Sequence, residues 1–142
     1  MGSRRKGRIL AFQGIFSWDI NPEQLDILSF SWLEEERRNK YDEMTLTFAS
    51  LLLKGTLDHI EEIDDSIRNH LVHWDFSRLN KVDLAVLRIS VYSLLYQTEI
   101  PGTVTINEAI GIAKLYGTDD SYKFVNGVLD SVKKEKGETK NT

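Results

Sequence analysis

The stretch from residue 81 to residue 130 constrains the fold more than any other part of the chain. It contains three apolar-rich segments, and the breaks between them fall at Pro101-Gly102 and at Gly117, which are stop signals for helices. In the first segment apolar residues repeat at helical spacing and also fill the flanks, so this helix is expected to be buried on most sides. The stretch therefore predicts three consecutive helices, of which the first is central.

The second and third of these helices carry their own boundary signals. Thr105 and Glu108 have the spacing of a capping box, so the second helix is expected to open there, and Gly117 is expected to end it. Gly127 interrupts the apolar stripe of the third helix at a cost of about 1 kcal/mol, and close backbone packing is the expected reason. The candidate caps of the third helix are Asp119, Asp120 and Ser121.

Apolar residues at helical spacing predict further helices earlier in the chain. They cover residues 4–19, a short helix that opens at Asn21-Pro22-Glu23 and continues through Leu25 and Leu28, residues 41–57, and residues 58–71. The last two are interpreted either as separate helices or as one interrupted helix. The charged run of residues 34–38 is interpreted as a solvated connection, and Ser77 as a cap before the central segment.

Length and composition indicate one all-α domain. A chain of 142 residues with 41% hydrophobic content and two prolines can build a core without a disulfide or a structural metal. The absence of cysteine excludes disulfide scaffolds and thiol catalysis. No apolar run is long enough for a signal peptide or a membrane span. We therefore expect a cytoplasmic protein with no membrane contact.

Positive charge gathers at the start of the first predicted helix, in Arg4, Arg5, Lys6 and Arg8. This is the positive end of the helix dipole, where anions are favoured by roughly 0.3–1 kcal/mol each, so local stability does not explain the cluster. Two interpretations remain open. The cluster either binds a polyanion such as nucleic acid, or it is a frayed and solvated start.

An aromatic and basic sequence, Tyr122-Lys123-Phe124, opens the third predicted helix. The two rings lie two residues apart, so they cannot both face the core squarely. Whichever ring stays outside would lie beside Lys123, and the pair could stack on an unpaired base while meeting its phosphate. The alternative is that both rings belong to the core and its rim.

The sequence contains no catalytic constellation. His70-x-x-His73, with His59 before it, is a metal-like spacing without further ligands nearby, so neither a metal nor another cofactor is expected. Phosphate loops, nucleophile elbows and zinc-protease motifs are absent, which predicts that the protein is not an enzyme. Trp74 is expected either to fill a gap between helices or to serve a protein interface.

Several separated motifs resemble the NusB family of transcription antitermination factors, in the right order and over almost the whole chain. They are the basic start with Trp18-Asp19, Val82-Asp83-x-x-x-Leu87-Arg88-x-x-x-Tyr92, Ile100-Pro101-x-x-Val104-x-Ile106-Asn107-Glu108-Ala109, Ala113-Lys114, and Lys123-Phe124-Val125-Asn126-Gly127-Val128-Leu129-Asp130. The resemblance implies an all-α fold of two small helical bundles packed crosswise, in a single RNA-binding domain over residues 1–142. Residues 1–8 are expected as a basic N-terminal arm and residues 136–142 as a flexible tail.

The same resemblance implies a function. In the family, NusB pairs with the ribosomal protein NusE, and the pair binds boxA single-stranded RNA of ribosomal RNA operon transcripts. This assembly supports read-through by RNA polymerase, in a complex with the Nus factors, and ribosome assembly. The resemblance implies RNA contacts at Arg4, Arg5, Arg8, Phe16, Asp120, Lys123 and Phe124. Partner contacts are expected at Trp74, Arg78 and Tyr92.

Some positions depart from the family pattern. Gly7 and Gly14 replace alanine, which is expected to weaken the first helix by roughly 1 kcal/mol per site and to let its start fray without RNA. Ser93 replaces a common glutamate on the partner-facing side, and Gly111 replaces another acid.

Three other interpretations stay open. The chain could be a helical protein-interaction module or a homodimer that meets proteins through Trp74 and Tyr92, without specific RNA binding. It could be a stand-alone relative of the RNA-docking domains that are fused to ribosomal RNA methyltransferases. The third alternative is a hydrolase or a metal enzyme.

Overall fold

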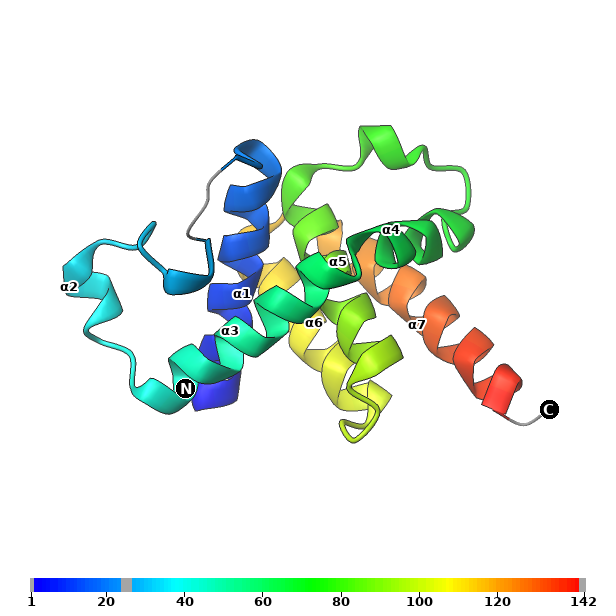
Figure 1. Ribbon diagram of the computed structural model, residues 1–142. Coiled ribbons are helices and arrows are strands. Elements are labelled where there is room, and N and C mark those ends of the chain that lie inside the picture. The colour runs from blue at the N-terminus through cyan, green and yellow to red at the C-terminus, as the bar shows by residue number, and fades with distance from the viewer. Residues whose placement is uncertain (1, 24–26, 141–142) are drawn as a thin grey trace.

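The computed structural model describes residues 2–23 and 27–140, with side chains as far as Gly137, and this part of the chain contains helices and no strands. The prediction of an all-α fold is confirmed (Figure 1). The elements are α1 (Ser3–Ile20), the 3-10 helix η1 (Ile27–Ser29), α2 (Glu35–Arg38), α3 (Glu43–Asp58), α4 (Ile60–Asn69), the 3-10 helix η2 (Phe76–Arg78), α5 (Lys81–Tyr96), α6 (Gly102–Tyr116) and α7 (Ser121–Lys140).

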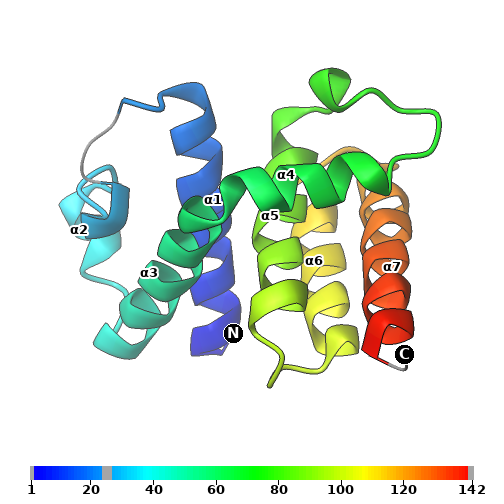
Figure 2. The same ribbon diagram turned by 45° about the vertical axis from the view of Figure 1, so that its right-hand side comes forward.

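The helices form two groups that cross one another. Figure 2 shows α1, α5, α6 and α7 roughly upright, while α3 runs obliquely over α1 and α4 crosses in front of α5. Helix α5 contacts α1, α3, α4, α6 and α7, so the prediction that it is central is confirmed. Apolar side chains from six helices lie fully inside this core, among them Leu10, Ile15, Leu52, Leu53, Ile63, Leu87, Val91, Ala113 and Leu129.

Helices α1 and α3 pack closely because two glycines stand between them. A Cβ atom added to Gly7 would lie 2.6 Å from Cδ1 of Phe48, and one added to Gly14 would lie 2.9 Å from Cδ2 of Leu53. The helix is regular from Ser3 onward, and Gly7 and Arg8 are both buried in it. Residues 3–8 of the predicted basic arm are thus the first turns of α1, and fraying of this start without RNA stays a prediction.

Two predicted caps lie elsewhere than expected. Helix α5 is capped by Asn80, whose Oδ1 accepts a hydrogen bond from the Asp83 backbone N–H at 2.7 Å. Ser77 instead donates its backbone N–H to Asp75 Oδ1, within the 3-10 turn η2. Thr105 is not a cap, because α6 begins three residues earlier at Gly102 and Thr105 is buried inside the helix.

Several other boundaries were predicted correctly. Gly117 is the C-cap of α6. Helices α3 and α4 follow one another directly, and His59 is the single residue that separates them. The helix expected after Asn21 is limited to the 3-10 turn η1 in the described residues, and Leu25 lies outside them. The charged run of residues 34–38 is largely exposed, as predicted, although it contains the short helix α2.

The last helix differs from its prediction at Gly127. Helix α7 continues to Lys140, and residues 141–142, the end of the predicted flexible tail, lie outside the described part. Gly127 is exposed, and no atom lies within 4 Å of the position that its Cβ would take. Close backbone packing is therefore not the reason for this glycine.

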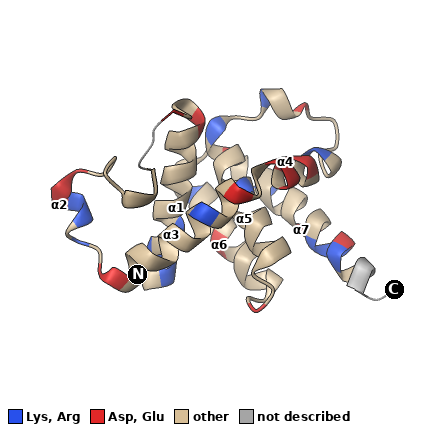
Figure 3. Ribbon diagram, viewed as in Figure 1, with Lys and Arg blue, Asp and Glu red and all other residues tan. Residues whose placement is uncertain are grey.

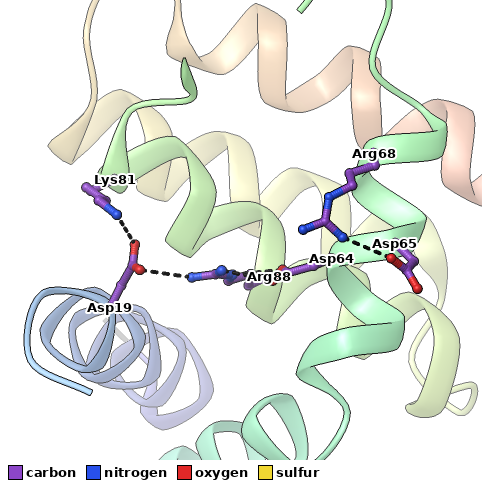
Figure 4. Close-up of polar contacts among 6 residues, drawn as sticks. All are labelled: Asp19, Asp64, Asp65, Arg68, Lys81 and Arg88. Atoms are coloured by element: carbon purple, nitrogen blue, oxygen red, sulfur yellow. Dashed lines mark hydrogen bonds and ion pairs between the residues drawn. The ribbon is translucent and has the colours of Figure 1, made fainter. Parts of the chain in front are cut away.

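An ion-pair network connects the two helix groups at their crossing. Arg88 of α5 lies between Asp64 of α4 and Asp19 of α1, and Lys81 pairs with the other oxygen of Asp19 (Figure 4). Because Arg88 and both carboxylates are largely buried, the network fixes α1 and α4 against the central helix.

None of the helices in the described residues has the length and apolar character that crossing a membrane requires.

Candidate nucleic-acid interface

The first turn of α1 presents positive charge to solvent. Arg4 and Arg5 are exposed, the first turn contains no acidic residue, and no side chain caps the helix at Gly2. Figure 3 shows this basic end, and a second group of basic residues near the C-terminal end of α7. The predicted cluster is therefore present and accessible at Arg4 and Arg5.

Arg5 is not unopposed, because it pairs with Glu108 of α6. Its Nε donates to Oε2 at 3.1 Å and its Nη2 donates to Oε1 at 3.4 Å. The hydrogen bond to Glu108 raises the pKa of Arg5 above its ordinary value. The side chain of Arg5 is still 54% exposed, so one side of the guanidinium can face a phosphate.

Arg8, a predicted phosphate contact, is largely buried. It is only 8% exposed, and its guanidinium carbon lies 5.4 Å from the centre of the Phe48 ring. Burial lowers the pKa of Arg8, although an arginine remains charged at neutral pH. The Arg8 side chain packs between α1 and α3, so its positive charge lies below the surface.

Side chains of α1 and α6 meet at two points, which mark a seam between the two helices. Arg5 meets Glu108 at one level, and Phe12 meets Tyr116 two turns further on, with ring centres 5.2 Å apart. Phe16 follows Phe12 by one turn on the same side of α1 and is half-buried. The seam therefore carries an arginine at one end and three aromatic rings toward the other.

The other flank of α6 meets the start of α7. Lys114 Nζ lies 4.9 Å from the centre of the Tyr122 ring, and Lys123 Nζ lies 5.9 Å from the same centre. Lys123 is exposed, whereas Tyr122 and Phe124 are both half-buried, so neither ring is left wholly outside. Both rings therefore lie at the rim of the core, and Tyr122 is the ring beside Lys123.

The basic start and the aromatic edge of α7 thus border the same helix. Their contacts on α6, at Glu108 and Lys114, are six residues apart in sequence, which corresponds to a rise of about 9 Å. Between these flanks α6 presents an outward stripe of exposed or open positions. We call this surface the α1–α6–α7 face, defined by Arg4, Arg5, Gly111, Lys114, Leu115, Tyr116, Tyr122 and Lys123.

Phe124 points away from Lys123 and lines a separate cleft of about 270 Å³. Its ring packs edge-on against Trp74, with ring centres 5.5 Å apart, and Trp74 is 60% exposed. Asp120 and Arg78 line the same cleft. The structure therefore brings two predicted RNA residues together with two predicted partner residues, around the N-terminal end of α7.

Tyr92 lies apart from that cleft. Its ring fits over Gly55 of α3, where an added Cβ would come within 2.1 Å of the ring, and it stacks on His59 and Tyr96. The three predicted partner residues thus do not form one surface, because Arg78 precedes α5 and Tyr92 is in its last two turns. Ser93, beside Tyr92, is buried, and its hydroxyl donates a hydrogen bond to Gln97 Oε1 at 2.6 Å.

The histidines have contacts of their own. His59 stacks on Tyr96 with ring centres 4.1 Å apart, and Nδ1 of His70 hydrogen-bonds to the Ser66 carbonyl at 2.6 Å. Within residues 2–23 and 27–140, no three His, Asp or Glu side chains are grouped in a way that could hold a metal ion.

Sequence reasoning missed three residues of the interface: Glu108 as the partner of Arg5, Lys114 and Tyr116. Glu108 and Tyr116 are eight residues apart, with Ile112 between them, so they share one side of a helix. That spacing could have identified the side of α6 that meets α1.

Comparison with known proteins agrees with this arrangement. The NusB family model matches residues 5–134. A transcription antitermination protein NusB from Treponema pallidum (strain Nichols) is 54% identical over 135 residues, which cover 92% of each chain.

Solved structures agree as well. NusB of T. maritima superposes with a TM-score of 0.82 at 38% identity, covering 93% of this chain and 91% of that one. A crystal structure of the antitermination factors NusB and NusE in complex with dsRNA gives a TM-score of 0.83 at 28% identity, covering 95% and 98%. From the family match over most of its length, together with its fold, this chain belongs to the NusB family.

Proposed function

We propose that the protein is a transcription antitermination factor, a non-enzymatic RNA-binding adaptor that acts in the cytoplasm. Together with the ribosomal protein NusE it binds boxA single-stranded RNA in ribosomal RNA operon transcripts. In this way it supports read-through by RNA polymerase within the complex of Nus factors, and ribosome assembly. The observation that carries the proposal is the junction of the exposed arginines of α1 and the lysine-aromatic edge of α7 on the two flanks of α6.

The chemistry of the α1–α6–α7 face suits unpaired RNA. Arg4, Arg5, Lys114 and Lys123 supply positive charge for phosphates, and Tyr116 supplies a partly exposed ring. Proteins that bind single-stranded nucleic acid combine such charges with aromatic platforms on which bases stack. Because few cations are involved, the electrostatic affinity of the protein alone is modest, and a protein partner is expected to raise it.

We propose the following contact residues. Arg4, Arg5 and Lys123 contact phosphates, and Phe16 contacts RNA at the end of the seam away from Arg5. Asp120 and Phe124 contact RNA at the edge of the cleft that they share with Trp74 and Arg78. That cleft is where we place the boundary between RNA and NusE. Because Arg8 is buried against Phe48, we do not include it among the proposed phosphate contacts.

A binding titration tests this proposal. Fluorescence anisotropy would measure the Kd of boxA single-stranded RNA, a scrambled RNA of equal composition, and a boxA duplex, each with and without purified NusE. We expect boxA single strands to bind most tightly, and more tightly with NusE than without it. Equal affinity for boxA and scrambled RNA in the presence of NusE would contradict the proposal.

A further inference from the structure

Tyr116 occupies a particular place on the α1–α6–α7 face, and we infer that it is a stacking platform for one unpaired base of the bound RNA. This inference rests on the proposed function, since it names a contact of the same RNA. It assigns a role to a residue at the end of α6, between the basic start of α1 and the aromatic edge of α7.

The ring of Tyr116 packs against the protein on one side and is exposed to solvent on the rest of its surface. It lies against Phe12, whose own side chain is only 3% exposed, with ring centres 5.2 Å apart and planes inclined at 44°. Tyr116 itself is 43% exposed. A ring that is held on one side and free on the other loses little conformational freedom when a base stacks on it.

The neighbours of this ring suit a nucleotide chain. Arg5 lies two helical turns back along the same seam, at Glu108, and the exposed Lys114 lies on the opposite flank of α6, beside Tyr122. Glu108 is the acidic residue of α6, and its charge is already paired with Arg5. An RNA chain that crosses α6 with one base on Tyr116 would therefore pass Arg5 on one flank and Lys114 on the other, which matches the combination of charge and aromatic rings in single-strand binders.

The acidic residues after α6 restrict where the phosphates of the RNA can lie. Asp119 and Asp120 are exposed and follow Tyr116 by three and four residues. Carboxylates repel phosphates but accept hydrogen bonds from the amino groups of bases. The backbone of the RNA is thus expected on the side of Lys114, with the base edges toward these aspartates.

Two substitutions at this position separate stacking from structural support. Tyr116→Phe keeps the aromatic face, whereas Tyr116→Leu keeps apolar cover over Phe12 without a face for stacking. We expect Tyr116→Leu to weaken binding of boxA single-stranded RNA by roughly tenfold and Tyr116→Phe to change it less than about twofold. The matched control is Tyr96→Leu on α5, which removes a ring of similar exposure, 38%, from the stack with His59.

A spectroscopic readout locates the base. BoxA RNA with 2-aminopurine in place of one adenine at a time reports stacking as loss of its fluorescence. We expect at least one position to be quenched by the wild-type protein and by Tyr116→Phe, and not by Tyr116→Leu. Thermal unfolding of each variant checks that the fold is intact.

The possible outcomes distinguish this inference from the proposed function. If the wild-type protein with NusE does not prefer boxA RNA, the proposed function fails. If the wild type prefers boxA, and folded Tyr116→Leu binds it as tightly as wild type with the same quenching, the stacking role of Tyr116 is overturned. Equal weakening by Tyr116→Leu and Tyr96→Leu would also overturn it, because the loss would then be a general effect of losing a ring.

Discussion

The guanidinium of Arg88 donates two parallel hydrogen bonds to the carboxylate of Asp64, from Nε to Oδ1 and from Nη2 to Oδ2, both at 2.9 Å. The two side chains are 7% and 13% exposed. The remaining nitrogen of Arg88 lies 3.6 Å from Asp19 Oδ1 (Figure 4). One arginine of the central helix therefore pairs with carboxylates from α1 and α4, and Lys81 supplies the second positive charge.

Replacement of Arg88 by methionine is expected to lower the free energy of unfolding by about 3–5 kcal/mol, because it leaves Asp64 buried without its cation and Asp19 with Lys81 alone. Urea denaturation followed by circular dichroism measures the loss. The matched control is Arg68→Met, since Arg68 pairs with Asp65 on the surface, where the two side chains are 50% and 72% exposed. The control should cost less than about 1 kcal/mol, and equal losses at the two sites would contradict the structural role of Arg88.

Gly7→Ala and Gly127→Ala are expected to change stability in opposite directions. Both glycines lie within helices, where alanine gains about 1 kcal/mol of propensity. At Gly7 the new methyl group would press on the Phe48 ring at 2.6 Å and on the Thr45 carbonyl oxygen at 3.3 Å, and such overpacking costs about 1–3 kcal/mol. At Gly127 it meets nothing within 4 Å. Thermal unfolding should show a lower Tm for the first variant and a higher Tm for the second, and a stabilised Gly7→Ala protein would refute the close contact of α1 and α3.

A negative charge at Gly111 is expected to weaken RNA binding. This position faces outward on α6 between the contacts of Arg5 and Lys114, and its Cβ would meet no atom within 4 Å. Gly111→Glu should raise the Kd for single-stranded RNA roughly fivefold, since a unit charge near a phosphate costs about 1 kcal/mol in water. Gly137→Glu adds the same charge to another open helical glycine, fourteen residues or about 21 Å along α7 from Lys123, and should leave the Kd unchanged. The anisotropy assay would refute the RNA path over α6 if both variants bound RNA equally.

The phenol of Tyr96 is expected to ionise at a higher pH than an ordinary tyrosine. Its hydrogen bond to Glu62, with partial burial, raises the pKa of Tyr96 to about 12. Because the folded pKa exceeds the unfolded value of about 10, the stability from this contact is fully present below pH 10 and is lost as the pH rises toward 12. Absorbance at alkaline pH should show one tyrosine fewer ionising near pH 12 in the Glu62→Gln variant than in wild type. An unchanged titration curve would show that Glu62 does not hold this phenol.

Helix α5 could be predicted from sequence because apolar residues cover most of its circumference, which only a central helix can bury. Thr105 misled the prediction because a capping pattern is local, whereas the start of α6 at Gly102 follows directly from the extended backbone at Pro101. The exposure of Arg5 and Lys123 agreed with their sequence pattern. The burial of Arg8 did not agree with its sequence pattern, because it depends on Phe48 of α3, and no local spacing relates Phe48 to α1. Arg5 and Glu108 are 103 residues apart in the chain, so their pairing is a property of the fold.

The central claim is that single-stranded RNA lies on the α1–α6–α7 face, and the salt dependence of RNA binding tests it most directly. The Kd for boxA RNA would be measured across salt concentrations for wild type, for Arg5→Ala with Lys123→Ala, and for the control Lys54→Ala with Arg68→Ala. The control also removes two paired or exposed cations, from α3 and α4, which lie in front of α5 in Figure 1 while α6 lies behind it. We predict weaker binding and a slope of log K against log salt that is shallower by about 1.4 for the first double variant, at about 0.7 per lost phosphate contact. Equal slopes for the two double variants would contradict the claim.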